Sequence, residues 1–174
     1  MKSDPSVDHR YKTTINFFEK VLPGQYSILD LGTHNDLTNI LLKKGHRVIN
    51  TMGQDLDLEP ESIIDYKVDV VTAFEILEHL VSPFPLLKML PSNKLIATVP
   101  LKLWFVKTYR NEKDPWDRHF HEFEDWQFDW LLEKAGWTIR ERIKWVSPSN
   151  RIGLRPLLRR FTPRYYGVYA EREH

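Results

Sequence analysis

The sequence contains no cysteine, which excludes disulfides, thiolate metal sites and a cysteine nucleophile and suits a reducing compartment. No uncharged apolar run reaches the roughly 18 residues that a membrane-spanning helix needs. The N-terminal stretch MKSDPSVDHRYK lacks the apolar core of a signal peptide. A net charge of +1 provides no whole-molecule field that would attract nucleic acid. We therefore expect a soluble cytoplasmic protein, and RNA is disfavoured as a partner.

The 174 residues fit one domain with a sizeable core. Short apolar runs alternate with helical patterns, which favours an α/β fold: a Rossmann-like open sheet, mostly parallel, with helices on both faces. The predicted strands are 27–31, 46–51, 68–74, 94–100, 137–146 and 165–171. The predicted helices are 13–22, a segment from Asp36 to Gly45 with Leu37, Ile40, Leu41 and Leu42 facing inward, 85–90 and 125–134.

Three segments stand apart from this alternation within a single domain, 1–174. Residues 1–25 are an N-terminal helical segment, 101–121 an aromatic lid loop, and 147–164 a basic insertion between the last two strands. No helix is expected within that insertion. Parallel neighbours need a longer crossover, so the last two strands predict an antiparallel end to the sheet.

The first strand runs into a turn that is suited to a ligand. In ILDLGTHNDL, Asp30 ends the strand, Gly32 follows, and Asp36 caps the next helix. A glycine lets the backbone approach a ligand closely, and the amides at a helix start suit a carboxylate. An ordinary tight turn would have the same pattern.

Four stretches together resemble the class I S-adenosylmethionine-dependent methyltransferases, particularly the group of O-methyltransferases of ubiquinone biosynthesis. They are ILDLG, DVVTAFEILEHL, PFPLLKMLPSNKLIATVP and HFHEFEDWQFDWLLEKAGW, in the family's order. The resemblance implies a seven-stranded sheet with an antiparallel last strand. Few residues separate Thr51 from Val68, so we expect a trimmed sheet of six strands.

The resemblance implies S-adenosylmethionine as the cofactor, although the usual Asp-x-Gly-x-Gly-x-Gly turn is altered. His34 and Asp36 replace two glycines; His34 could bind the cofactor's carboxylate, whereas Asp36 would repel it unless it caps its helix. Met52 stands where an acidic residue usually holds the ribose, and Asp55 or Asp57 could substitute. The candidate cofactor-binding residues are Asp30, Gly32, Thr33, His34, Met52, Asp55 and Phe74.

The loop after the third strand carries the candidate catalytic groups. Glu75, Glu78 and His79 have the i, i+3, i+4 spacing that places side chains on one face of a helical turn. With His119 or His121 they could bind a divalent metal, as in some relatives with this pattern. Without metal, Glu75 or His79 is a candidate general base, and we take Glu75, His79 and His119 as the catalytic set. Alternatively, the Glu-His pair only orients the loop.

His119 and His121 lie one residue apart in an extended segment, so we expect only one of them to face the pocket. The aromatic residues of the lid loop either stack on a planar or sugar acceptor or pack as a lid. They are Trp104, Phe105, Tyr109 and Trp116.

Between Arg142 and Arg164 the sequence has Lys and Arg but no Asp or Glu. This basic segment indicates an anionic acceptor, a peripheral membrane contact or RNA, unless it is a solvated loop. The basic residues are Arg142, Lys144, Arg151, Arg155, Arg159, Arg160 and Arg164.

The sequence thus predicts methyl transfer from S-adenosylmethionine to a small, anionic or sugar-containing acceptor. The alternative is a binding or regulatory module that kept the fold and lost turnover, and RNA methylation is a weaker one. The acceptor atom, the use of a metal and the oligomeric state stay open.

Overall fold

The computed structural model describes residues 5–147 and 153–173. Six strands form one sheet in the order β2-β1-β3-β4-β6-β5. The strands are β1 (Ser27–Asp30), β2 (Arg47–Asn50), β3 (Val70–Phe74), β4 (Lys94–Pro100), β5 (Thr138–Trp145) and β6 (Tyr165–Glu171). The helices are α1 (Pro5–Val21), α2 (Asp36–Lys43), α3 (Pro83–Met89), α4 (Asp125–Lys134) and α5 (Leu154–Phe161), with short 3₁₀ turns at Pro60–Ile63, Leu77–His79 and Pro115–Asp117.

The sheet confirms the predicted topology. Strands β2, β1, β3 and β4 are parallel, and β6 runs antiparallel to both β4 and β5. The six-stranded, Rossmann-like plan with an antiparallel end is therefore correct. Because the chain goes from β1 outward to β2 and then returns to the other side of β1, the strand order reverses beside β1, which is where open α/β sheets bind ligands.

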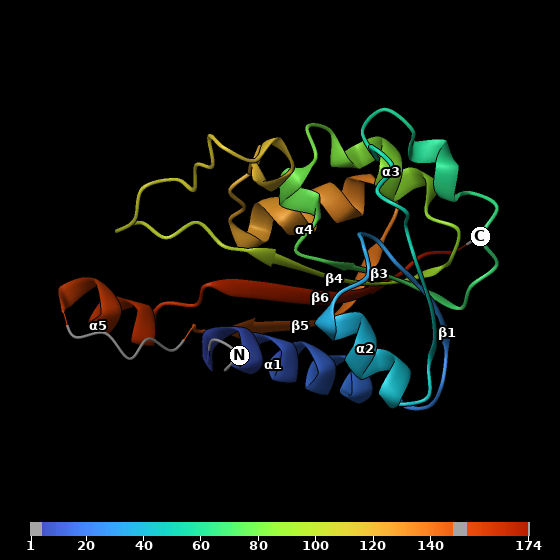
Figure 1. Cartoon of the computed structure of the whole chain (residues 1–174), viewed down its shortest axis with the longest axis horizontal. Coiled ribbons are helices and arrows are strands. Elements are labelled where there is room, and N and C mark those ends of the chain that lie inside the picture. The colour runs from blue at the N-terminus through green and yellow to red at the C-terminus, as the bar shows by residue number, and fades with distance from the viewer. Residues whose placement is uncertain (1–4, 148–152, 174) are drawn as a thin grey trace.

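Helices cover both faces of the sheet, with α1 and α2 on one side and α3 and α4 on the other (Figure 1). Apolar residues of the sheet alternate between the two cores. Phe18, Ile28 and Leu41 pack in the core on the α1 and α2 side, and Leu87 and Phe128 in the core on the α3 and α4 side. Burial on both faces explains why the central strands read as continuous apolar runs.

Several local predictions are corrected by the structure. Asn35, not Asp36, caps α2, because its side-chain oxygen accepts from the amides of Leu37 and Thr38. Leu42 does not face inward but is 43% exposed. The first helix starts at Pro5, well before the predicted Thr13.

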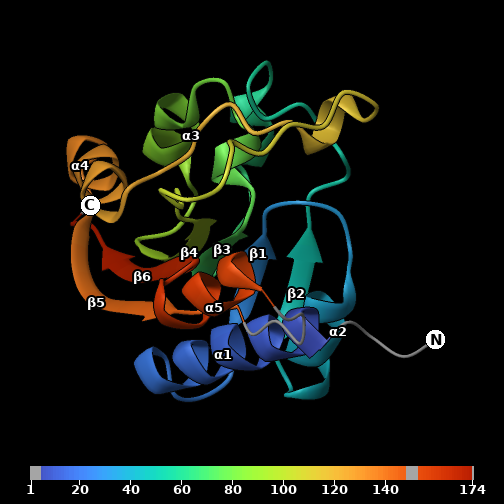
Figure 2. The same cartoon turned by 90° about the vertical axis from the view of Figure 1, so that its left-hand side faces the viewer.

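The insertion between the last two strands contains α5, a helix that the prediction lacked. Its many arginines and its proline suggested an irregular segment, but a proline is tolerated in the first turn of a helix. α5 stands at the end of the molecule that faces the viewer in Figure 2. Arg151 lies outside the described residues. Among the helices of the described ranges, none is long and apolar enough to cross a membrane.

Candidate functional site

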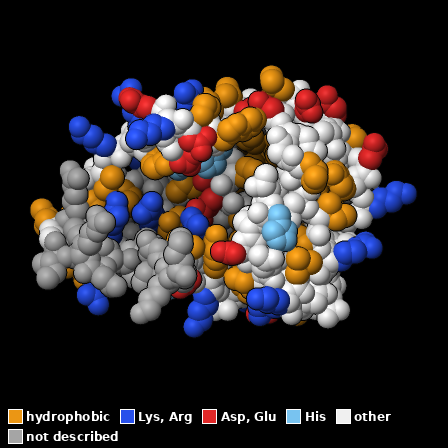
Figure 3. Space-filling view, in the orientation of Figure 1, with side chains coloured by type: hydrophobic (Ala, Val, Ile, Leu, Met, Phe, Trp, Pro, Cys, Tyr) orange, Lys and Arg blue, Asp and Glu red, His pale blue; other side chains and the backbone are white. Residues whose placement is uncertain are grey.

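A cleft of about 360 Å³ lies at the carboxyl ends of β3 and β4, beside the point where the strand order reverses. This size falls within the roughly 300–1,000 Å³ of small-molecule sites. In Figure 3, acidic, histidine and basic side chains gather around the hollow in the middle of the face. The lining residues are Arg10, Tyr11, Thr14, Asn35, Leu37, Phe74, Glu75, Glu78, His79, Pro100, Tyr109, Asp117, His119, Arg164 and Tyr165.

Glu75 continues β3 into the cleft with a strained backbone. Its amide donates to the Thr98 carbonyl at 2.9 Å, while its φ of 53° lies in the left-handed region that a non-glycine residue rarely adopts. The Glu75 carboxylate accepts a hydrogen bond from the Arg10 guanidinium. Burial raises the pKa of Glu75, although Arg10 opposes this.

The loop after β4 folds back over Glu78 and brings His119 into the cleft. The amides of Phe120 and His121 both donate to the Glu78 carbonyl, at 2.8 and 3.2 Å. His119 then packs edge-on against His79, with 4.7 Å between the ring centroids. A backbone pairing of Phe123 with Leu101 fixes the end of this loop.

Glu78 is an unusual buried carboxyl. Its exposed fraction is 1%, and its Oε2 has no hydrogen-bond partner among the described residues. Burial and the nearby Glu75 carboxylate hold the pKa of Glu78 well above its usual range. A buried polar atom without a partner is costly, so this oxygen is suited to a proton or cation that a bound reactant or ion would bring.

His79 and His119 complete a compact group with Glu78. His79 Nδ1 donates to the Arg118 carbonyl at 3.1 Å, and its Nε2 lies 3.8 Å from Glu78 Oε1. Burial and then the neighbouring His79 lower the pKa of His119 to about 4, so its ring is neutral near pH 7. Candidate ligand atoms of the three residues lie within 4.8 Å of one another, and the donor set suits a divalent metal.

The turn after β1 is organised differently, because its polar groups bind one another. Asp30 is 2% exposed and accepts from Thr72 Oγ1 at 2.7 Å, Asn50 Nδ2 at 3.0 Å and Thr38 Oγ1 at 3.2 Å. Burial raises the pKa of Asp30 to about 6. Gly32 has φ 110°, which requires glycine, and its amide donates to Thr51 Oγ1.

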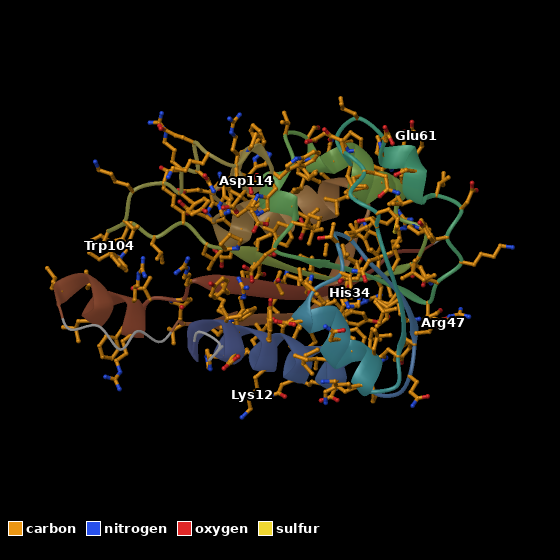
Figure 4. All side chains as sticks on the ribbon, in the orientation of Figure 1. Lys12, His34, Arg47, Glu61, Trp104 and Asp114 are labelled. Atoms are coloured by element: carbon orange, nitrogen blue, oxygen red, sulfur yellow. The ribbon has the colours of Figure 1, made fainter. Side chains whose placement is uncertain are left out.

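Neither residue that replaces a glycine blocks the cleft. His34 is exposed at the amino end of α2 (Figure 4), and its Nε2 lies 2.8 Å from Asn39 Oδ1. Asp36 is also exposed, in the first turn of α2. The two amides that the helix start was expected to offer a ligand are already bound by Asn35.

The residues that were predicted to bind the nucleoside of the cofactor are poorly placed to do so. Met52 is 85% exposed. The Asp55 carboxylate accepts from the amide of Asp57, and the Asp57 carboxylate accepts from the amides of Val81 and Ser82. Both oxygens of Asp57 are therefore engaged, whereas Asp55 Oδ2 accepts no hydrogen bond among the described residues and leaves Asp55 as the available replacement for the missing ribose ligand.

The cleft brings together some predicted residues and not others. Phe74, Glu75, Glu78, His79 and His119 line it. His121 points elsewhere, with its Nε2 3.2 Å from the Val81 carbonyl oxygen. The candidates that are not among the lining residues are Asp30, Gly32, Thr33, His34, Met52 and Asp55. Of the lid aromatics, Tyr109 lines the cleft, whereas Trp104 and Trp116 are 76% and 70% exposed.

Sequence reasoning missed the contribution of α1 and β6. Arg10, Tyr11 and Thr14 of α1 line the cleft, as do Arg164 and Tyr165 at the start of β6. No motif marks Arg10, since only the packing of α1 places it over Glu75. For Arg164, the absence of acidic neighbours in the basic segment was the available signal.

The cleft fits the amino-acid end of S-adenosylmethionine better than its nucleoside. Arg10 Nε is buried without a partner among the described residues, and Arg164 adds a second guanidinium. Such groups suit a carboxylate. Near Met52, Asp55 Oδ2 is the carboxylate oxygen left for a ribose, since both oxygens of Asp57 accept backbone amides.

A larger hollow of about 580 Å³ lies at the opposite, amino-terminal edge of the sheet, where Ser27, Arg47 and Asp69 are among the lining residues. Asp69 already accepts from the amide and hydroxyl of Ser27, and these bonds lower its pKa. The reactive groups are gathered in the cleft instead.

No family model and no curated protein matches the sequence. Solved structures do match the fold. Magnesium protoporphyrin IX methyltransferase from Synechocystis PCC 6803, solved with bound S-adenosylhomocysteine, is 13% identical with a TM-score of 0.60, over 97% of this chain and 84% of that chain. An S-adenosylmethionine-dependent methyltransferase from Archaeoglobus fulgidus is 17% identical with a TM-score of 0.52, over 95% and 93%.

The [4+2]-cyclase SpnF also matches, at 14% identity and a TM-score of 0.59, over 93% of this chain and 81% of that chain. The same architecture is therefore compatible with different reactions, and the residues of the cleft must decide between them. The strand order, the antiparallel end and these matches agree: this chain has the fold of the class I S-adenosylmethionine-dependent methyltransferases.

Proposed function

We propose that the protein transfers a methyl group from S-adenosylmethionine to a small acceptor bound in the cleft between α1 and the lid loop. The observation that carries this proposal is the Glu78 carboxylate: its Oε2 is buried without a partner among the described residues, and candidate ligand atoms of Glu78, His79 and His119 lie within 4.8 Å of one another. A domain that only binds a ligand has no need for a buried carboxylate that destabilises the fold. An enzyme that removes a proton from its acceptor needs such a group.

Each part of the cleft has a distinct task in this proposal. Arg10 and Arg164 bind the carboxylate of the cofactor's methionine, and Phe74 packs against the cofactor beside Glu75. When bound, the cofactor supplies an electrophilic methyl group. His119, neutral near pH 7, accepts the proton of the acceptor's hydroxyl, and Tyr109 packs 4.4 Å from the His119 ring and keeps it in place.

Glu78, His79 and His119 would also suit a divalent cation that accepts imidazole ligands, such as Mn²⁺ or Zn²⁺, which would lower the pKa of an acceptor hydroxyl. The metal is testable apart from turnover. Mn²⁺ titration followed by electron paramagnetic resonance should report one site in the full chain, and Glu78→Gln should weaken it by about tenfold or more. Equal Mn²⁺ affinity in both proteins would leave proton transfer by His119 as the only role of the cluster.

Calorimetric titration with S-adenosylmethionine and S-adenosylhomocysteine tests the cofactor. We expect dissociation constants below about 1 mM, and loss of binding in Gly32→Val, where a side chain would strain the turn and its Cβ would lie 3.3 Å from Ile76 Cδ1. Gly136→Val is the matched control, because Gly136 has a similar positive φ of 91° but no neighbour within 4 Å. If the two variants bind alike, the turn is not part of the cofactor site.

The second candidate is a binding module without turnover. Two observations favour it: Met52 stands in place of a ribose ligand, and both carboxylate oxygens of Asp57 accept backbone amides. If the folded wild-type protein binds neither S-adenosylmethionine nor S-adenosylhomocysteine, the binding module is the correct function. A weaker candidate, RNA methylation, would need acceptor activity on RNA oligonucleotides.

A further inference from the structure

Two exposed apolar features lie at the same end of the molecule, outside the catalytic cleft. α5 exposes Leu154, Leu157 and Phe161 by 73%, 54% and 76%. Their i, i+3, i+7 spacing places them on one face of the helix. Trp104 of the lid loop is 76% exposed and lies at this end too (Figure 4). Exposed large apolar groups in this number indicate an interaction surface.

The helix and the loop are neighbours. A small cavity of about 130 Å³ is lined by Leu103, Val106 and Lys107 of the loop and by Arg159 of α5. Trp104 lies between these loop residues in the sequence. The apolar face of α5 and Trp104 therefore belong to one composite surface, which we call the α5 face.

Basic side chains predominate on the α5 face. The loop stretch LKLWFVKTYRN and the whole segment from Arg142 to Arg164 contain Lys and Arg but no Asp or Glu. Arg160 and Lys107 are exposed. Glu122 is the acidic exception: it also lines the small cavity, and its Oε1 accepts from the Tyr109 amide at 2.7 Å.

The arrangement of charge and apolar groups selects the partner. On the helix, the position of Arg160 borders the stripe of Leu154, Leu157 and Phe161, whereas Arg159 lies on the opposite side and lines the small cavity. An apolar stripe with a basic residue at its border, beside an exposed Trp on a neighbouring loop, is typical of a surface that lies in the interface of an anionic membrane. RNA would leave the apolar stripe in water, and a second copy of this chain would bring the same positive charge.

We propose that the α5 face docks on the surface of an anionic lipid bilayer. The apolar stripe and Trp104 enter the boundary between headgroups and acyl chains, while Arg160 and Lys107 meet the anionic headgroups. The small cavity shares Pro100, Tyr109, His119 and Arg164 with the catalytic cleft, so docking brings the cleft close to the lipid surface. Membrane binding itself does not depend on the proposed methyl transfer.

Flotation of the full chain with vesicles tests the proposal. Vesicles of phosphatidylcholine with one-third phosphatidylglycerol should bind the protein, pure phosphatidylcholine vesicles should bind it at least about tenfold more weakly, and binding should fall as salt rises. Trp104→Phe should reduce the blue shift of tryptophan fluorescence that binding causes.

The double variant Leu157→Ser/Phe161→Ser should lower vesicle partitioning by about tenfold or more, because both side chains are exposed and their loss removes only the apolar anchor. Leu58→Ser/Ile64→Ser is the matched control, since those side chains are 77% and 55% exposed away from α5. Circular dichroism verifies that each variant is folded.

Lys107→Gln/Arg160→Gln should reduce the preference for phosphatidylglycerol while weak binding to neutral vesicles persists. Three results would overturn the proposal. They are equal partitioning of the two serine variants, no binding to anionic vesicles, and concentration-dependent dimerisation that the Leu157→Ser/Phe161→Ser change abolishes while vesicle binding stays unchanged. Binding of single-stranded RNA in place of vesicles would likewise assign the face to another partner.

Discussion

The turn after β1 and the turn after β3 sit side by side at one edge of the sheet, yet they treat their polar groups in opposite ways. After β1, Asp30 is surrounded by three donors and the helix start is capped by Asn35. After β3, Glu78 Oε2 is buried without a partner among the described residues. The first turn satisfies its polar groups internally, whereas the second leaves a buried carboxylate oxygen without a partner.

The largest effect is expected at the second turn. Glu78→Gln should lower the rate of S-adenosylhomocysteine release with a methyl-accepting substrate by about 10²–10⁴-fold, because the amide cannot take part in proton or metal chemistry. The free energy of unfolding should change by less than about 1 kcal/mol, since the isosteric amide removes a buried ionisable group. Full activity of a folded Glu78→Gln protein would show that the turn after β3 has no special chemical role. Glu133→Gln, at an exposed position, is the control.

The first turn should instead make stability depend on pH. The folded-state pKa of Asp30, about 6, lies above its ordinary value of 3.8 because of burial. The stability that this raised pKa provides is therefore complete below about pH 4 and is lost as pH rises to about 6, by up to about 3 kcal/mol. Urea unfolding of wild type and Asp30→Asn at several pH values measures this, and the difference between the proteins should vary over that range only.

Removing one donor at the first turn should have a smaller effect. Thr72→Val deletes the hydroxyl that donates to Asp30 Oδ1 at 2.7 Å and should cost about 1.5 kcal/mol of unfolding free energy. Thr98→Val on the neighbouring strand is the matched control, because Thr98 is equally buried but its Oγ1 has no partner among the described residues. If both variants lose the same free energy of unfolding in chemical denaturation, the hydrogen bond to Asp30 contributes no additional stability.

The smallest effect is expected at His34, the most conspicuous change in the sequence motif. His34→Ala should change the free energy of unfolding by less than about 0.5 kcal/mol, because the side chain is exposed and bonds only Asn39 among the described residues. Calorimetry should give unchanged affinity for S-adenosylhomocysteine. A clear loss of affinity would return His34 to the cofactor site.

The fold could be predicted because apolar periodicity is local. The runs at 94–100 and 165–171 and the helix at 125–134 match β4, β6 and α4, and the short connection after Thr51 correctly indicated six strands. Much of the cleft could not be predicted in this way. Arg10 reaches Glu75 only through the packing of α1, across a long sequence separation.

Helix caps and hydrogen-bond partners could not be predicted from the sequence either. Asn35 and Asp36 are both good capping residues, and only backbone geometry decides between them. Asp30 belongs to a recognised motif, but its side chain serves Thr38, Asn50 and Thr72, residues that the motif does not contain. The grouping of Glu78, His79 and His119 was predictable because two of the three are adjacent and the third lies in the loop that precedes α4 at the same edge.

The link from α5 to β6 is short: the helix ends at Phe161 and the strand begins at Tyr165, with Arg164 between them at the cleft. If α5 lies on a membrane surface, this short link would fix the distance between that surface and the reacting atoms in the cleft. Acceptors that are anchored in the same bilayer would then be selected by how far their polar headgroups project from it. This selection would come before any contact inside the cleft.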